Sequence, residues 1–217
     1  MKSNLLKITL LAFITVGAMS CKNNEKNADV EVAEAAEATE TAVAYTVDTA
    51  ASTIKWEGKK PTATHHGTIS LADGTLFVNN GEIEAGDFTI DMKSIKVEDL
   101  EGESKANLEA HLMGTVEGKE GDFFNTNKYP TAKFELTGIE NNMVKGNLTI
   151  KDKTNAVAFP AKVAVDGDKI TFTSESFEID RTKWGANFGS KSVFDNLGDK
   201  FVHDEIKLTV TLTATKK

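Results

Sequence analysis

The chain has 217 residues, with 25 Lys and Arg against 33 Asp and Glu, so its formal net charge is −8 at pH 7. A single cysteine excludes an intramolecular disulfide framework, and the acidic balance disfavours a protein that binds a nucleic-acid backbone. With only 3 prolines and 16 glycines, the chain is not collagen-like. The length allows one large domain or two small ones with a sizeable core.

The N-terminal residues 1–20 have the features of an export signal. Lys2 and Lys7 precede an apolar run, residues 8–16, that is too short to span a bilayer, and small residues follow it. The only cysteine, Cys21, stands directly after Ala18-Met19-Ser20, which resembles the lipobox of a bacterial lipoprotein signal. We therefore expect removal of a lipoprotein signal peptide and acylation of Cys21. A secreted protein without an anchor is the alternative.

The segment that follows, residues 21–44, is predicted to be a lipidated cysteine and a disordered acidic tether. It consists mainly of Ala, Glu, Thr, Asn and Lys, with valine as its only larger apolar residue, so it has little surface to bury. This organisation predicts an exported, membrane-anchored lipoprotein of the bacterial envelope that faces the periplasm or lies on the cell surface. A single folded domain then occupies residues 45–217.

From Tyr45 onward, apolar residues recur with a period of two. Clear cases are Ile54 with Trp56, the even positions of 144–150 and the even positions of 206–212. Such alternation is typical of strands with one buried and one wet face. The apolar parity changes between Phe172 and Phe177, which predicts a β-bulge.

Turn-forming pairs separate these runs and predict tight hairpins between antiparallel neighbours. The pairs are Asp73-Gly74, Asn80-Gly81, Asn141-Asn142 and Asp166-Gly167. One stretch departs from the strand pattern: in residues 104–113, Leu108 and Leu112 stand four apart, which predicts a short amphipathic helix. The expected fold is an all-β, antiparallel up-and-down barrel of about eight strands with this helix.

Ten segments, taken in their order, resemble the YceI-like family of lipocalin-like, polyisoprenoid-binding periplasmic proteins over nearly all of residues 45–217. They are 45–48, 52–56, 65–67, 86–92, 111–112, 122–124, 129–134, 144–150, 179–185 and 204–208. The resemblance implies a lipocalin-like barrel whose apolar cavity holds a long isoprenoid chain, such as an isoprenoid quinone, and it implies no catalysis. Residues 114–121 form a longer insertion than the family leads us to expect.

A cavity of this kind needs apolar and aromatic walls. The candidates for a ligand-binding wall are Trp56, Phe88, Ile90, Met92, Leu108, Leu112, Phe134, Leu148, Phe159, Phe172, Phe177 and Phe188. A filled eight-stranded barrel needs the same residues inside, so for each one singly core packing is the better interpretation. The sequence does not distinguish a hollow barrel from a filled one.

Among the polar residues, His111 and Arg181 are candidates either to tie the helix to the barrel, the favoured interpretation, or to meet a ligand's polar head group at the mouth. No metal site is expected, because the adjacent His65 and His66 point to opposite faces of a strand. The sequence has no Gly-x-Ser-x-Gly elbow, no cysteine in the folded region and no phosphate-binding loop, so we expect neither an enzyme nor a catalytic cofactor.

The predicted function is therefore non-catalytic binding of a long-chain isoprenoid or similar apolar lipid, for storage, shielding or transport. The helix at 108–113 and the insertion after it are expected to gate the cavity. The expected partners are this lipid and the membrane, without nucleic acid, and a homodimer is compatible with the sequence. The rival hypothesis is a solid barrel, an envelope stress or interaction protein that binds a protein partner.

Overall fold

The computed structural model describes residues 31–217, so the predicted signal peptide and Cys21 lie outside the described residues. The described residues form ten strands, one α-helix and two 3₁₀ helices. These are β1 (Val43–Val47), β2 (Thr53–Lys60), β3 (Ala63–Asn79), β4 (Glu82–Val97), α1 (Gly102–Met113), β5 (Thr131–Glu140), β6 (Met143–Ile150), β7 (Lys153–Asp166), β8 (Lys169–Ser174), β9 (Phe177–Asp180), η1 (Arg181–Trp184), η2 (Gly198–Lys200) and β10 (Glu205–Lys216).

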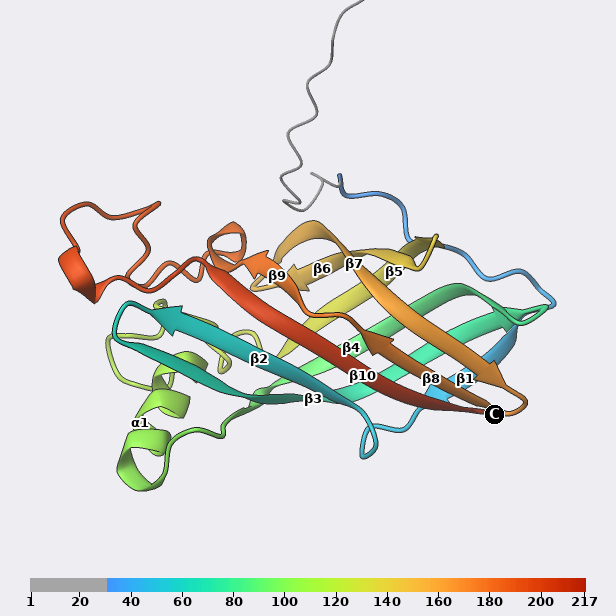
Figure 1. The fold of residues 1–217 in the computed structure, drawn as a ribbon, viewed down its shortest axis with the longest axis horizontal. Coiled ribbons are helices and arrows are strands. Elements are labelled where there is room, and N and C mark those ends of the chain that lie inside the picture. Colours follow the sequence, from blue (N-terminus) through green and yellow to red (C-terminus); the bar gives the residue numbers. More distant parts are fainter. Residues whose placement is uncertain (1–30) are drawn as a thin grey trace, which may run out of the picture.

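Eight of the strands close into an antiparallel ring (Figure 1). Each of β2 to β7 pairs with the next strand in chain order, and β10 pairs with both β8 and β2, which closes the ring. The two remaining strands extend the wall, since β1 pairs with β10 and β3 while β9 pairs with β10. This confirms the expected all-β barrel of about eight strands with one short helix.

Alternation along the strands places one row of side chains inside the ring. In β8, for example, Ile170, Phe172 and Ser174 are buried while the residues between them are exposed. The predicted β-bulge lies at the junction of β8 and β9. Phe172 is opposite Leu212 and Phe177 is opposite Leu208, so β10 uses one residue fewer over this interval. The extra residue explains the change of parity.

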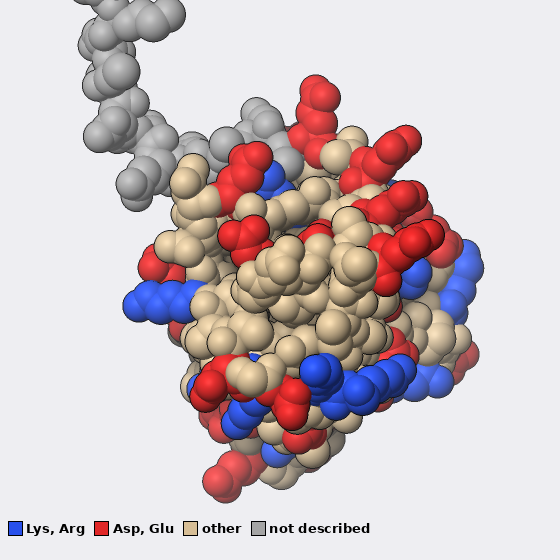
Figure 2. Space-filling model, turned by 90° about the vertical axis from the view of Figure 1, so that its right-hand side faces the viewer, with Lys and Arg blue, Asp and Glu red and all other residues tan. Residues whose placement is uncertain are grey.

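Three of the four predicted hairpin turns are confirmed. The backbones of Asn80-Gly81, Asn141-Asn142 and Gly167 have positive φ and connect β3 to β4, β5 to β6 and β7 to β8. These three hairpins lie at the same end of the barrel, because the strands run up and down in turn. Figure 2 looks onto this end, where uncharged side chains cover the centre.

The fourth turn, Asp73-Gly74, is wrong, because both residues lie inside β3. A Cβ atom on Gly74 would lie 2.7 Å from Phe88 Cδ1 and 3.0 Å from Val47 Cγ2, so the glycine permits close packing rather than a turn. The register between β3 and β4 shifts between Leu71 and Asp73, which bends the strand at this point.

The opposite end of the barrel carries α1 and the long connection 185–204, both at the left of Figure 1. The helix begins two residues before the predicted segment and ends at Met113, where Gly114 caps it in the left-handed conformation. Within residues 31–217, no helix has the length and apolar character that a membrane span requires.

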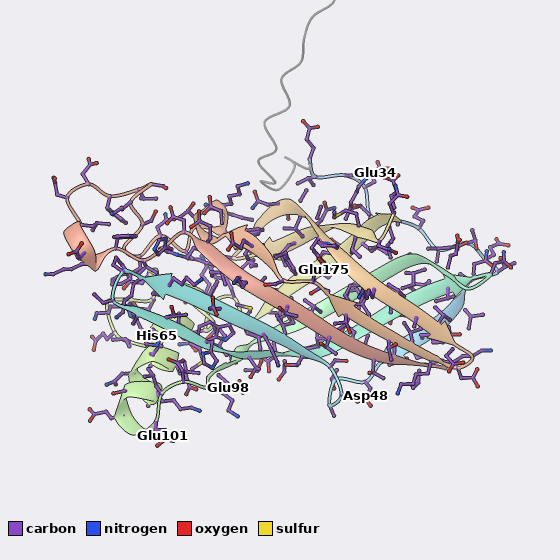
Figure 3. The ribbon with its side chains drawn as sticks, in the orientation of Figure 1. Glu34, Asp48, His65, Glu98, Glu101 and Glu175 are labelled. Atoms are coloured by element: carbon purple, nitrogen blue, oxygen red, sulfur yellow. The ribbon has the colours of Figure 1, made fainter. Side chains whose placement is uncertain are left out.

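The described part of the predicted tether, residues 31–42, lies against the outer wall. Ala33 exchanges hydrogen bonds with the side chain of Asn147, Ala36 N–H donates to the Leu136 carbonyl over 2.8 Å, and Thr39 donates to the Glu84 carboxylate. Glu34 marks this segment in Figure 3. Residues 33–39 are therefore attached to the wall by one backbone carbonyl and by the side chains of Asn147 and Glu84, whereas the sequence predicted a solvated tether.

Candidate binding cavity

A cavity of about 360 Å³ lies inside the ring of strands, so the barrel is hollow. Its wall contains residues of β2 to β10 and of α1. All twelve residues predicted for the wall line it: Trp56, Phe88, Ile90, Met92, Leu108, Leu112, Phe134, Leu148, Phe159, Phe172, Phe177 and Phe188. His111 and Arg181 line it as well. Their contact with a ligand stays a prediction.

Aromatic rings form a continuous strip along this wall. The ring centroids of Phe88 and Phe134 are 6.0 Å apart, and those of Phe134 and Phe159 are also 6.0 Å apart. Phe159 then stacks on Phe177 at 4.2 Å with an interplanar angle of 9°. The rings come from β4, β5, β7 and β9, and they give this wall a flat apolar surface.

The mouth of the cavity lies at the end of the barrel that carries α1. Of the described residues that line the cavity, five are exposed, and all lie at this end: Lys59, Lys60, Phe188, Lys200 and His203. No residue of the hairpin turns at the other end lines the cavity. The cavity is therefore open at one end and closed at the other.

The helix α1 covers one side of the mouth. Leu108 and Leu112 line the cavity, and Val97 of β4 donates its backbone N–H to the Glu109 carboxylate over 2.8 Å. His111 Nε2 lies 2.7 Å from Asp122 Oδ2, and its ring packs edge-on against Phe188 at 4.7 Å. His111 thus connects the helix to the loops around it.

Arg181, at the start of η1, ties the loop 186–203 to the barrel. Its guanidinium donates to the backbone carbonyls of Ala186, Phe188, Val202 and His203, and it lies 3.5 Å from Asp204 Oδ1. The side chain is almost completely buried, and burial lowers the pKa of the guanidinium while the nearby carboxylates oppose that shift. Its acidic partner is Asp204, while the carboxylate of the neighbouring Asp180 accepts hydrogen bonds from Thr182.

Sequence reasoning missed a second cation that organises this end, Lys151. It lies in the turn between β6 and β7, and its ammonium donates to the carbonyls of Phe123 at 2.6 Å and Gly185 at 2.8 Å. Burial lowers the pKa of this lysine. The sequence gives little sign of this role. Lys151 and Asp152 both have positive φ in the turn, but the pair contains neither the glycine nor the asparagine that usually indicates such a turn.

The predicted absence of a metal site concerns His65 and His66. His65 Nδ1 lies 2.7 Å from Asp99 Oδ2, and the His66 backbone N–H donates to the same carboxylate. Burial alone would raise the pKa of Asp99, but these two hydrogen bonds outweigh it and hold the pKa below its usual value. Figure 3 labels His65 at the α1 end of the barrel. Across residues 31–217, no three His, Cys, Asp or Glu side chains gather as metal ligands.

Other proteins share this sequence pattern and fold. Residues 45–214 match the family described as YceI-like domain. BcnA of Burkholderia cenocepacia is 25% identical, with a TM-score of 0.52 over 78% of this chain and 99% of that chain. A structure described as a polyisoprenoid binding domain from Saccharophagus degradans, implicated in plant cell wall breakdown, is 13% identical, with a TM-score of 0.56 over 81% and 99%.

A curated relative matches over a shorter region. The UPF0312 protein SAB2563 of Staphylococcus aureus is 37% identical over 76 residues, which are 32% of this chain and 44% of that protein. The chain thus aligns with less than half the length of this relative. The alignment therefore bears on part of the barrel and not on the whole protein's activity.

Proposed function

The chain belongs to the YceI-like family, and from this membership and its hollow barrel we propose that it binds a long-chain isoprenoid or similar apolar lipid without catalysis. The bound lipid is stored, shielded from water or carried between membranes. The observation that carries the proposal is the apolar cavity with its strip of neighbouring phenylalanine rings. The Saccharophagus degradans domain, with the same fold, is described as polyisoprenoid-binding.

The energetics of the cavity favour such a ligand. Burial of apolar surface contributes roughly 25 cal/mol per Å², so some 400 Å² of buried lipid surface gives about 10 kcal/mol before losses. The entropy of ordering the chain offsets part of this gain. A cavity of about 360 Å³ also lies within the range of ligand pockets, roughly 300–1,000 Å³.

We further propose that the protein acts from the bacterial envelope. Acylation of Cys21 would anchor the chain, since each buried CH₂ contributes about 0.8 kcal/mol to membrane binding. The mature barrel, residues 45–217, would then stay near the membrane that supplies its ligand. The rival hypothesis, a barrel that binds a protein partner, requires a solid interior, and the cavity counts against it.

Native mass spectrometry tests the proposal. The protein is purified gently from its own envelope, its mass is compared with that of the bare chain, and organic extracts are analysed for lipids. A stoichiometric isoprenoid is the expected result. An empty protein that also fails to take up added farnesol or quinone would contradict lipid binding and favour the protein-binding rival.

A further inference from the structure

The ionisable side chains that line the cavity are all bases. Among residues 31–217, no Asp or Glu lines the cavity, although acidic residues outnumber Lys and Arg in the whole chain, 33 to 25. Its ionisable members are all basic: Lys59, Lys60, His65, His111, Arg181, Lys200 and His203. Because the protein as a whole is acidic, the presence of bases alone among the ionisable lining residues requires an explanation.

Four of these bases are engaged within the protein. His65 and His111 face Asp99 and Asp122, and Arg181 is held by backbone carbonyls and Asp204. Lys59 lies 3.1 Å from Glu57 Oε1. Each of these four bases therefore lies beside a carboxylate of the protein that can balance its charge.

The side chains of the other three bases have no such partner, although His203 also borders a smaller surface hollow lined in part by Glu57, Glu178 and Glu205. In the described part of the chain, the side chains of Lys60, Lys200 and His203 form no hydrogen bond or ion pair with the protein, and all three residues are exposed. The His203 ring packs only against Phe201, with centroids 4.9 Å apart. Lys60, Lys200 and His203 are called the free basic residues below.

The free basic residues come from two segments that lie side by side at the mouth. The backbone N–H of His203 donates to the Lys59 carbonyl over 2.9 Å, which places the loop 198–203 along the end of β2. Phe188, 39% exposed, lies at the same rim, and the wall beneath is apolar. The lining thus combines cationic groups at the opening with apolar surface inside.

We propose that the cavity selects amphiphiles with an anionic head group, a phosphate or carboxylate, held at the mouth by Lys60, Lys200 and His203. This rests on the proposed function, because the apolar chain of the same molecule has to occupy the cavity. A phosphate oxygen accepts charge-assisted hydrogen bonds from lysine, whereas a neutral quinone or alcohol gains little there. A cationic head group is repelled by the unbalanced lysines.

Farnesyl phosphate and farnesol test the inference, since they share a chain and differ in the head group. Binding to the full chain, carrying Cys21→Ser so that no acyl group of its own competes, is measured by calorimetry and by the fluorescence of Trp56 in the cavity wall. We expect farnesyl phosphate to bind about tenfold more tightly, with the ratio falling as salt is raised from about 0.05 to about 0.5 M.

A matched pair of variants assigns the effect to the mouth. Lys60→Gln, Lys200→Gln and His203→Gln together should reduce the farnesyl phosphate to farnesol ratio about fivefold or more. The control carries Lys55→Gln, Lys162→Gln and His66→Gln, the same changes at exposed positions that do not line the cavity, and it should keep the ratio.

The outcomes separate the inference from the proposed function. Equal affinity for the two ligands would overturn the head-group inference while lipid binding stands. Failure of both ligands to bind would overturn the proposed function and the inference with it. Displacement of farnesyl phosphate by an equal concentration of inorganic phosphate would overturn the amphiphile assignment in favour of a site for free phosphate.

Discussion

The two ends of the barrel are built by different means. At the closed end, β3–β4, β5–β6 and β7–β8 are joined by tight turns of Asn, Asp and Gly, and none of these turns lines the cavity. At the mouth, α1, the loop 186–203 and the turn at Lys151 are held by side chains that reach backbone carbonyls. The closed end is fixed by local backbone chemistry, and the mouth is fixed by long-range contacts.

This difference suggests a division of labour. A hairpin turn sets the register of its two strands through the residues of the turn itself, so the structure of the closed end does not depend on which ligand is bound. Loops held by a few buried polar side chains can be remodelled without altering the strands, which is where binding residues are commonly found. Changes at the two ends should therefore affect different properties.

The largest effect is expected from Arg181→Leu. Removal of the guanidinium leaves four carbonyls without this donor and Asp204 without its ion-pair partner, so the free energy of unfolding should fall by about 3 kcal/mol. Urea denaturation measures the loss, and hydrogen exchange should increase first in residues 186–203. Lys183→Leu in the same 3₁₀ helix is the control, and an equal loss there would contradict the assigned role.

Val157→Trp tests the cavity itself. Val157 lines the cavity on β7, so an indole there would fill part of the space that a lipid chain needs. Affinity for farnesol should fall about tenfold or more, while unfolding free energy changes by less than about 1.5 kcal/mol. Undiminished binding would show that the chain lies elsewhere.

Leu108→Glu with Leu112→Glu tests α1 as a gate. Both leucines face the cavity, and carboxylates there should hold the helix away from the mouth. We expect lipid uptake and release to speed up about fivefold, measured by stopped-flow fluorescence. Ser104→Glu with Asn107→Glu, on exposed helix positions, serves as the control. Unchanged rates in the leucine variant would dismiss the gate.

Asp99→Asn tests the attachment of β3 at the mouth. The pKa of Asp99 is lowered in the folded state, so its contribution is complete above the unfolded value of about 3.9 and is lost as the pH falls through the lower folded value. The variant should lose about 1 kcal/mol at pH 7, and the difference from wild type should shrink below about pH 4. A pH-independent difference would exclude the charged hydrogen bonds as its cause.

The smallest effect is expected at the closed end, from Gly81→Ala. The glycine has φ of 83° and no atom within 4 Å of an added Cβ, so only backbone strain of about 1 kcal/mol is introduced. Unfolding free energy should fall by that amount while the farnesol affinity stays constant. A change in affinity would break the proposed separation between the two ends.

The sequence alone determined the barrel and its closed end. Period-two alternation, the pairs Asn80-Gly81 and Asn141-Asn142, and the parity change before Phe177 are local signals, because each depends on the residues within a strand or turn. Nine of the twelve predicted wall residues that line the cavity lie in these strands, while Leu108 and Leu112 lie in α1 and Phe188 lies in a loop. The pair Asp73-Gly74 gave a wrong prediction, because Gly74 is required for close packing against Phe88 on the next strand and not for a turn.

Only the tertiary structure decided that the interior is hollow and that the ionisable residues lining it are bases. Hollow and filled barrels use the same inward residues, and the choice depends on how the whole ring closes. Lys60 and Lys200 are 140 positions apart and look like ordinary surface lysines in the sequence. The closed ring of strands places both lysines at one opening. No local sequence pattern indicates that they are close, because contacts between distant segments depend on the packing of all the strands together.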